Sequence, residues 1–128
     1  MPHFHIEYSG NLNGHVDMAA YCELIQRTIL ATGLFELGAI RVRAFCADHY
    51  VVTDMLPQNG FIDMSFRVGA GRTPEQLKNV GETIFKSASD FLRSQFDTPH
   101  FALSLEIREI DAALSWKKNS MHARLRQG

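Results

Sequence analysis

Residues 61–80 read FIDMSFRVGAGRTPEQLKNV and join a strand pattern directly to a helix start. Apolar and polar residues alternate from 62 to 68, as in a strand with one buried face. Residues 69–72 form a predicted tight turn. Thr73 then stands as a helix N-cap, with proline in the first helical position and Gln76 closing a capping box. This stretch therefore predicts a strand, a turn and a helix in immediate succession.

The second half of the chain completes this unit with another strand. Apolar residues recur at helical spacing, so the helix is predicted to run to about Asp97. Pro99 lies just beyond this point and ends the pattern. Residues 101–110 (FALSLEIREI) alternate again and predict a strand. Beyond Asp111 the sequence has little regular pattern apart from residues 114–116 (LSW).

The first half of the chain follows the same order. Residues 3–8 (HFHIEY) and 39–46 (AIRVRAFC) alternate. Between them, Asp17 is predicted to cap a helix that runs to about Thr32, where Gly33 is well placed as the residue after its end.

Together these patterns predict an α+β fold in a single domain over residues 1–128. Its two βαβ units, at about 2–54 and 61–110, would share a four-stranded mixed sheet with two helices on one face. A short β-rich stretch at 50–53 is also predicted before the second unit. The uncovered face of the sheet would carry His, Arg and Ser side chains. This face is a candidate contact with partner subunits in a cyclic oligomer.

Composition excludes several classes of function. The net charge of −1 gives no electrostatic case for nucleic acid or an anionic membrane. No apolar run approaches the length of about 18 residues that a membrane span needs. Cys22 and Cys46 lie far apart and form no CxxC pair, which favours a reducing, cytoplasmic location. The turn at 69–71 lacks the spacing of a phosphate-binding loop, so nucleotide binding is not expected.

Several segments, in order along the whole chain, carry a resemblance to a known family. They are MPHF at 1–4 with EYS at 7–9, ATGLF at 31–35, IRVR at 40–43, GAGR at 69–72, and KKN and MHA between 117 and 123. In this combination the chain resembles the 5-carboxymethyl-2-hydroxymuconate isomerases of the tautomerase superfamily.

The resemblance implies a homotrimer of double βαβ subunits with active sites at the subunit boundaries. It also implies a cofactor-independent isomerisation of a carboxylated dienol, in the catabolism of homoprotocatechuate. Family members use the N-terminal proline as general base, which here is Pro2 after removal of Met1. They hold the substrate carboxylates with arginines, and Arg41, Arg72 and Arg43 are the matching residues.

The residues themselves are compatible with these roles. An α-amino group titrates near pH 8, and burial and neighbouring arginines lower its pKa further, which suits a base at neutral pH. Arg41 and Arg43 lie two apart on one strand and project from the same face. Arg72 lies directly before the predicted cap, where the helix N-terminus favours an anion.

Other interpretations remain open from the sequence. His3 and His5 share a strand face, but no third ligand is evident and no metal is predicted. Trp116, with the two lysines after it, either closes a pocket or packs against a neighbouring subunit. The same proline and arginines could serve a phenylpyruvate-type tautomerase or a haloacrylate hydratase or dehalogenase. If Met1 is retained, the chain would instead be a non-catalytic trimeric binding module.

Overall fold

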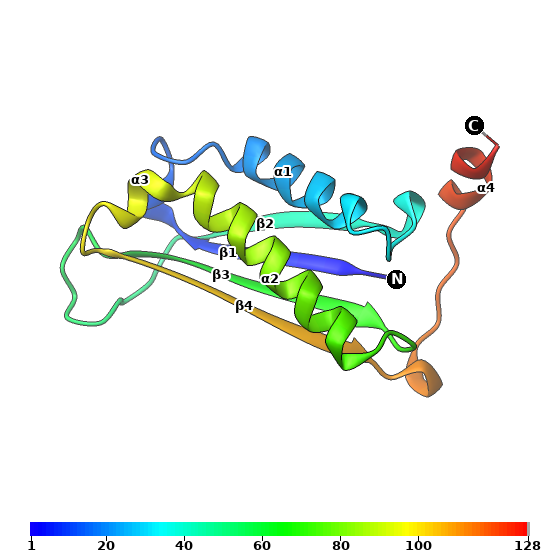
Figure 1. The fold of residues 1–128 in the computed structure, drawn as a ribbon. Coiled ribbons are helices and arrows are strands. Elements are labelled where there is room, and N and C mark those ends of the chain that lie inside the picture. The colour runs from blue at the N-terminus through cyan, green and yellow to red at the C-terminus, as the bar shows by residue number, and fades with distance from the viewer. Residues whose placement is uncertain (128) are drawn as a thin grey trace.

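The computed structural model describes residues 1–127 and shows two long helices packed on one face of a four-stranded sheet (Figure 1). The strand order is β2-β1-β3-β4. β1 pairs with β2 in parallel, β3 pairs with β4 in parallel, and the two pairs meet in the antiparallel pairing of β1 with β3. The predicted α+β fold with a four-stranded mixed sheet is therefore confirmed.

The main elements follow the predicted order. In the first half they are β1 (His3–Ser9), α1 (Met18–Ala31) and β2 (Arg41–Ala47), and in the second β3 (Gly60–Gly69), α2 (Pro74–Phe91) and β4 (Phe101–Ile110). Shorter helices complete the chain: η1 (Gly10–Leu12), η2 (Leu37–Ala39), α3 (Arg93–Phe96), η3 (Ala112–Leu114) and α4 (Met121–Arg126).

Local capping chemistry sets the helix ends as predicted. The Asp17 carboxylate accepts a hydrogen bond from the Ala20 N–H at 3.0 Å. Thr73 and Gln76 form the full capping box, each side chain bonding the backbone N–H of the other. Gly33 follows α1 with φ of 75°, a left-handed conformation that glycine adopts without strain.

Two predicted elements are wrong in detail. Residues 50–53 form no strand, because Thr53 and Met55 have positive φ angles of 46° and 68°. The buried Asn59 holds this loop: its Nδ2 lies 3.2 Å from the Val52 carbonyl oxygen and 2.7 Å from Asp54 Oδ1. The strand predicted at residues 39–46 also begins later than expected, because Ala39 belongs to η2.

The long second helix breaks before its predicted end near Asp97. Leu92 leaves the helical conformation, with φ of −96° and ψ of 16°, and the four-residue α3 follows. Leu92 is buried in the core. Phe96, on α3, packs edge-on against Phe101 at the start of β4, with ring centroids 5.0 Å apart. The break therefore turns the chain towards β4 while Leu92 stays buried.

A core of apolar side chains joins the helices to the sheet. Phe4, Ile6, Met64 and Phe66 are fully buried beneath α1 and α2. Burial of a large apolar side chain of this kind contributes about 1.5–3 kcal/mol. The alternation seen in the sequence thus assigns one face of each central strand to the core.

The opposite face of the sheet carries polar residues in rows that cross the strands. One row, at the end of β1 where the chain starts, contains Arg41, His3, Arg67 and Arg108. No helix covers this face in Figure 1, where both long helices lie on the other side. The row holds three arginines, with His3 between Arg41 and Arg67, so this end of the sheet is basic although Arg108 is paired with Glu106.

Candidate active site

Pro2 is buried directly before β1, at the end of the sheet past which the C-terminal segment runs (Figure 1). Its carbonyl accepts a hydrogen bond from the backbone N–H of Arg41 at 3.3 Å. Met1 precedes Pro2 in this chain, so the Pro2 nitrogen is an amide nitrogen and cannot take up a proton. A base at this position therefore requires removal of Met1.

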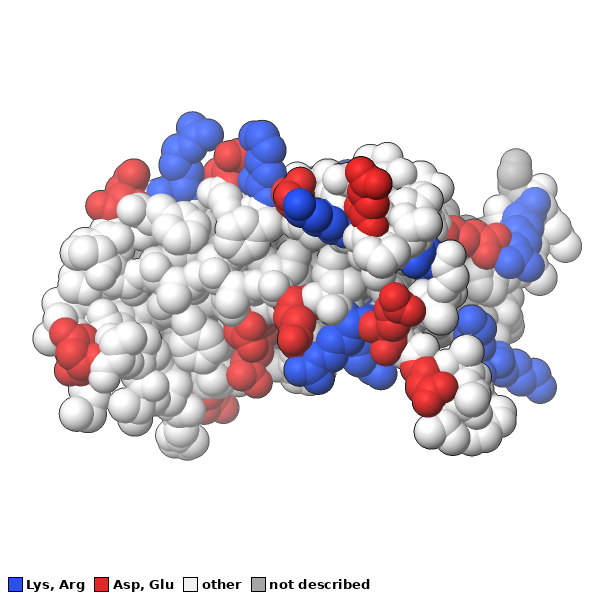
Figure 2. Space-filling model, turned by 60° about the horizontal axis from the view of Figure 1, so that its bottom comes forward, with Lys and Arg blue, Asp and Glu red and all other residues white. Residues whose placement is uncertain are grey.

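A cavity of about 490 Å³ opens beside Met1. Its lining comes from all four strands or their ends and from the C-terminal segment: Met1, His3, Arg41, Arg67, Ile110, Ser115, Trp116, Lys117 and Lys118. Two arginines and two lysines are among these residues, and none of them carries a side-chain carboxylate. In Figure 2, Lys and Arg side chains are visible at the end of the molecule that carries the C-terminal segment. The cavity is therefore electrostatically suited to an anionic molecule.

Arg41 is brought to the cavity by the pairing of β2 with β1. It lies opposite His3, and its guanidinium donates to the Ala39 carbonyl at 2.8 Å. This bond holds the side chain near the chain start and leaves further N–H groups for a ligand, since a guanidinium has five. Arg41 thus lies on the cavity-facing side of β2, and its contact with a substrate carboxylate stays a prediction.

Arg43 lies one row away and contacts His3 instead of lining the cavity. Its Nη1 is 3.2 Å from His3 Nδ1. A guanidinium can only donate, so His3 Nδ1 must accept, which requires a neutral imidazole. Burial and then the charges of Arg43, Arg67 and Arg41 lower the pKa of His3, in agreement with this geometry. Arg43 therefore contacts a residue that lines the cavity and does not line the cavity itself.

Arg72 lies close to the chain start, but its side chain is bound within the protein. Nε and Nη2 donate to the Leu34 carbonyl at 3.2 and 2.8 Å, and Nη1 donates to the Gly69 carbonyl at 3.2 Å. The guanidinium also lies over the Phe35 ring. Arg72 is not among the cavity-lining residues. Its part in carboxylate binding remains a prediction.

The N-terminal amine lies in an environment that disfavours its charged form. Burial is the largest cause that lowers its pKa from the ordinary value of 8.0, followed by the Lys117 ammonium and then by Arg72 and Arg41. A lowered pKa increases the fraction of neutral amine at neutral pH. This lowering is that of the Met1 amine, and a free amine on Pro2 would lie one residue further along the chain.

The sequence patterns did not identify Arg67 or assign Lys117 a role at this cavity. Arg67 belongs to the polar face of the predicted strand at 61–68, but only the antiparallel pairing places it opposite His3. Lys117 follows β4 in a segment without a regular pattern. Both residues reach the cavity through long-range contacts, so periodicity could not reveal them.

Comparison with known proteins agrees with this architecture. The sequence profile described as 5-carboxymethyl-2-hydroxymuconate isomerase matches residues 2–125. The chain belongs to the 5-carboxymethyl-2-hydroxymuconate isomerase family. It is similar to the Escherichia coli 5-carboxymethyl-2-hydroxymuconate Delta-isomerase, with 32% identity over 123 residues, covering 96% of this chain and 98% of that protein. The chain is thus an isomerase of this family.

Solved structures of the same family have the same fold. The 5-carboxymethyl-2-hydroxymuconate isomerase from Deinococcus radiodurans R1 is 34% identical, with a TM-score of 0.85 and coverage of 98% of this chain and 94% of that one. A 5-carboxymethyl-2-hydroxymuconate delta-isomerase, 29% identical, has a TM-score of 0.91 with coverage of 100% and 95%. N1, a member of the cis-3-chloroacrylic acid dehalogenase family, shares only the fold, at 14% identity and a TM-score of 0.63.

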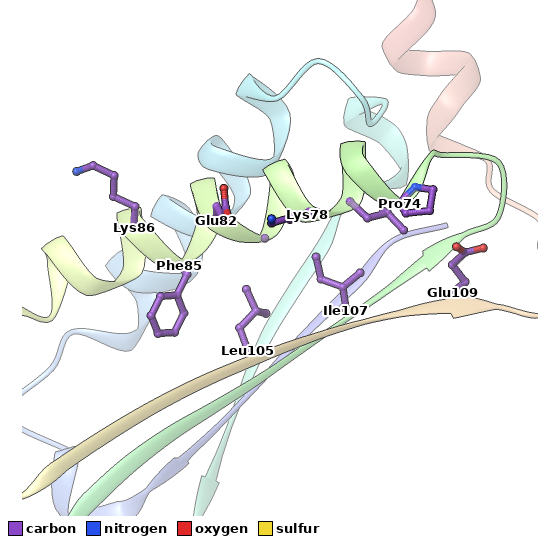
Figure 3. Close-up of a pocket in the computed structure, with 10 residues that line it drawn as sticks. Pro74, Lys78, Glu82, Phe85, Lys86, Leu105, Ile107 and Glu109 are labelled. Carbon is purple, nitrogen blue, oxygen red and sulfur yellow. The ribbon is translucent and has the colours of Figure 1, made fainter.

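This isomerase has a second cavity, of about 670 Å³, between α2 and β4 (Figure 3). Phe85 points from α2 towards Leu105 and Ile107 of β4, and these apolar side chains form much of the lining. The charged groups at this cavity are of both signs, including Lys78 and Glu109. It has no concentration of positive charge comparable to that beside Met1.

The two histidines at the start of β1 make contacts other than metal ligation in the structure. Among residues 1–127, no group of three or more His, Cys, Asp or Glu side chains is arranged to hold a metal ion. His3 contacts Arg43, and His5 stacks on Phe45 with ring centroids 4.8 Å apart. In the same part of the chain, no helix has both the length and the apolar character to cross a membrane.

Proposed function

We propose that this chain isomerises 5-carboxymethyl-2-hydroxymuconate, or a closely similar carboxylated dienol, with Pro2 as general base. The family profile carries this proposal, because its match begins at residue 2 and so includes the proline. The basic cavity beside the chain start supports it, since the proposed substrate carries carboxylates. The pathway served would be the catabolism of homoprotocatechuate.

Removal of Met1 would convert the Pro2 amide into a free secondary amine between Met1's place in the cavity lining and His3. The neutral amine would take the proton from the enol hydroxyl of the substrate. The oxygen would become the 2-oxo group as the double bonds shift, and the amine would return the proton to the distal carbon. Proton transfer and positioning are sufficient for this reaction, so the proposal includes no cofactor.

The arginines would orient the substrate and stabilise the developing oxyanion. Arg41 would bind a carboxylate directly, because it lines the cavity. Arg72 and Arg43 would contribute their positive charge to the site. For direct contact with a substrate carboxylate, their side chains would have to move away from their present hydrogen-bond partners. The polar uncovered face of the sheet supports assembly as a homotrimer, with this face towards neighbouring copies.

The test begins with intact mass, which should show that the purified protein lacks Met1. The mature protein should ketonise the dienol, followed by ultraviolet absorbance. A matched variant with an N-terminal extension that cannot be removed keeps Pro2 as an amide. Its kcat should fall by about 10²–10⁴-fold, the usual contribution of a positioned base. Equal activity in the extended variant would exclude Pro2 as the base.

A substrate panel separates the alternatives. Aryl enols and haloacrylates should react far more slowly than the carboxylated dienol. Preferential turnover of haloacrylates would contradict the isomerase proposal. Retained Met1 in protein from the native host, together with inactivity towards the whole panel, would favour a binding module.

A further inference from the structure

The C-terminal segment forms part of the cavity wall. After β4 ends at Ile110, the chain passes the N-terminus and reaches α4 near η2 (Figure 1). On the way it contributes Ser115, Trp116, Lys117 and Lys118 to the cavity lining. We call residues 115–120 the C-terminal strap.

The segment before the strap and the end of the strap each form a specific contact. Before the strap, Asp111 caps η3 by accepting a hydrogen bond from the Ala113 N–H at 2.9 Å. At its end, the Asn119 amide donates to the Gly38 carbonyl at 2.8 Å. The far end of the strap is therefore tied to η2, beside the cavity.

The helix after the strap, α4, binds to Glu36, the residue that directly precedes η2. Arg126 Nη2 donates to Glu36 Oε2 at 2.6 Å, and Arg126 Nε forms a second hydrogen bond to the same carboxylate. His122 Nδ1 lies 2.9 Å from Glu36 Oε2, although without the alignment of a hydrogen bond. The absence of a side chain at Gly38 lets His122 approach: a Cβ there would lie 2.7 Å from His122 Nδ1.

Lys117 is the strap residue whose charge acts on the chain start. Its ammonium is the second-largest influence, after burial, on the pKa of the N-terminal amine. It has no carboxylate partner among the cavity-lining residues, and neither does any other cation there. An anion in this cavity would therefore meet an ammonium without a carboxylate partner beside Met1, the residue that precedes the proposed base.

We propose that Lys117 is a substrate-binding residue that engages a carboxylate of the dienol and so positions the substrate against Pro2. This inference rests on the proposed function. A lysine suits this place as a compact point charge on a flexible stem. The strap would thus place a residue near the C-terminus in the same substrate site as the N-terminal proline.

The experiment compares two dienols in the mature enzyme, one with the additional carboxymethyl group and one without it. Lys117→Met keeps the apolar stem and removes the charge. Loss of a hydrogen bond to a charged group should raise KM for at least one dienol by about 10- to 100-fold, with a smaller change in kcat. Lys117→Arg should restore most of the affinity. Lys78→Met, on α2 outside this cavity, is the matched control and should behave as the wild type.

A second variant tests the strap without altering the ammonium. Asn119→Ala removes the bond to the Gly38 carbonyl, so it should raise KM in the same direction as Lys117→Met. Unchanged KM for both dienols in Lys117→Met would overturn the inference. A pH-profile shift with unchanged KM would also overturn it, because Lys117 would then act through the amine alone. Inactivity of the mature wild type towards both dienols would instead count against the proposed function.

Discussion

The guanidinium of Arg72 stacks on the ring of Phe35, with its Cζ atom 4.0 Å from the ring centroid. The same group donates two hydrogen bonds to the Leu34 carbonyl. Arg72 thus ties the turn after β3 to the segment between α1 and β2. These contacts give Arg72 a structural role in addition to the predicted contact with substrate.

Replacing Arg72 by lysine should therefore destabilise the protein even though the charge is kept. Lysine cannot reproduce the planar stacking or the fork of donors. We expect a loss of about 1–3 kcal/mol in the free energy of unfolding, measured by urea denaturation. Arg27→Lys is the control, because the Arg27 side chain is 64% exposed on α1. Equal stability of Arg72→Lys and the wild type would show that the stacking contributes little.

Gly38→Ala should release α4 from η2. The added methyl group would meet His122, including its backbone Cα at 3.4 Å. We expect faster amide hydrogen exchange and proteolysis in residues 115–127, with little change in the strands. The double variant Gly38→Ala/His122→Ala removes the nearest contact and should recover part of the protection. Unaltered exchange in Gly38→Ala would mean that the helix adjusts without detaching.

Thr73→Ala should weaken the start of α2. The substitution removes the side-chain acceptor for the Gln76 N–H, bonded at 3.1 Å. Loss of such a cap costs about 0.5–2 kcal/mol of stability, measurable by thermal unfolding. Thr83→Ala changes an exposed threonine within the same helix and serves as the control. A larger loss in Thr83→Ala than in Thr73→Ala would contradict the importance of the capping box.

His3 should make the folded state sensitive to mild acid. Its pKa is lowered in the folded protein from the ordinary value of 6.5, so the unfolded chain binds a proton first as the pH falls. The contribution of His3 to stability is therefore present above pH 6.5 and decreases as the pH falls through the folded-state pKa.

The His3→Gln variant isolates this effect. Urea unfolding of the wild type and the variant between pH 7.5 and 5 should show the wild type losing more stability over this interval. His15→Gln, at an exposed position, should follow the wild type. Parallel pH dependence of wild type and His3→Gln would indicate that other groups cause the acid sensitivity.

Local patterns in the sequence were sufficient to predict the order of the main strands and helices of this protein. Alternation assigned Phe4 and Phe66 to the buried face and His3 and Arg41 to the other. Asp17 and Thr73 marked the helix starts because a cap is a hydrogen bond within three residues of the chain. The family resemblance pointed to Pro2, because the position of this proline directly after Met1 can be read from the sequence alone.

The tertiary structure decided what depends on distant parts of the chain. The break at Leu92 arises from packing against the core and β4, and the place of Arg67 beside His3 arises from strand register. The path of the segment that carries Lys117 depends on contacts between α4 and Glu36. Arg126, which makes one of these contacts, lies 90 positions after Glu36 in the chain. Periodicity and capping are local properties of a chain, whereas register and long-range packing exist only after it folds. For this reason the sequence and the resemblance pointed to Pro2 and Arg41 as candidates, and only the folded structure showed the cavity that Arg41, Arg67 and Lys117 line.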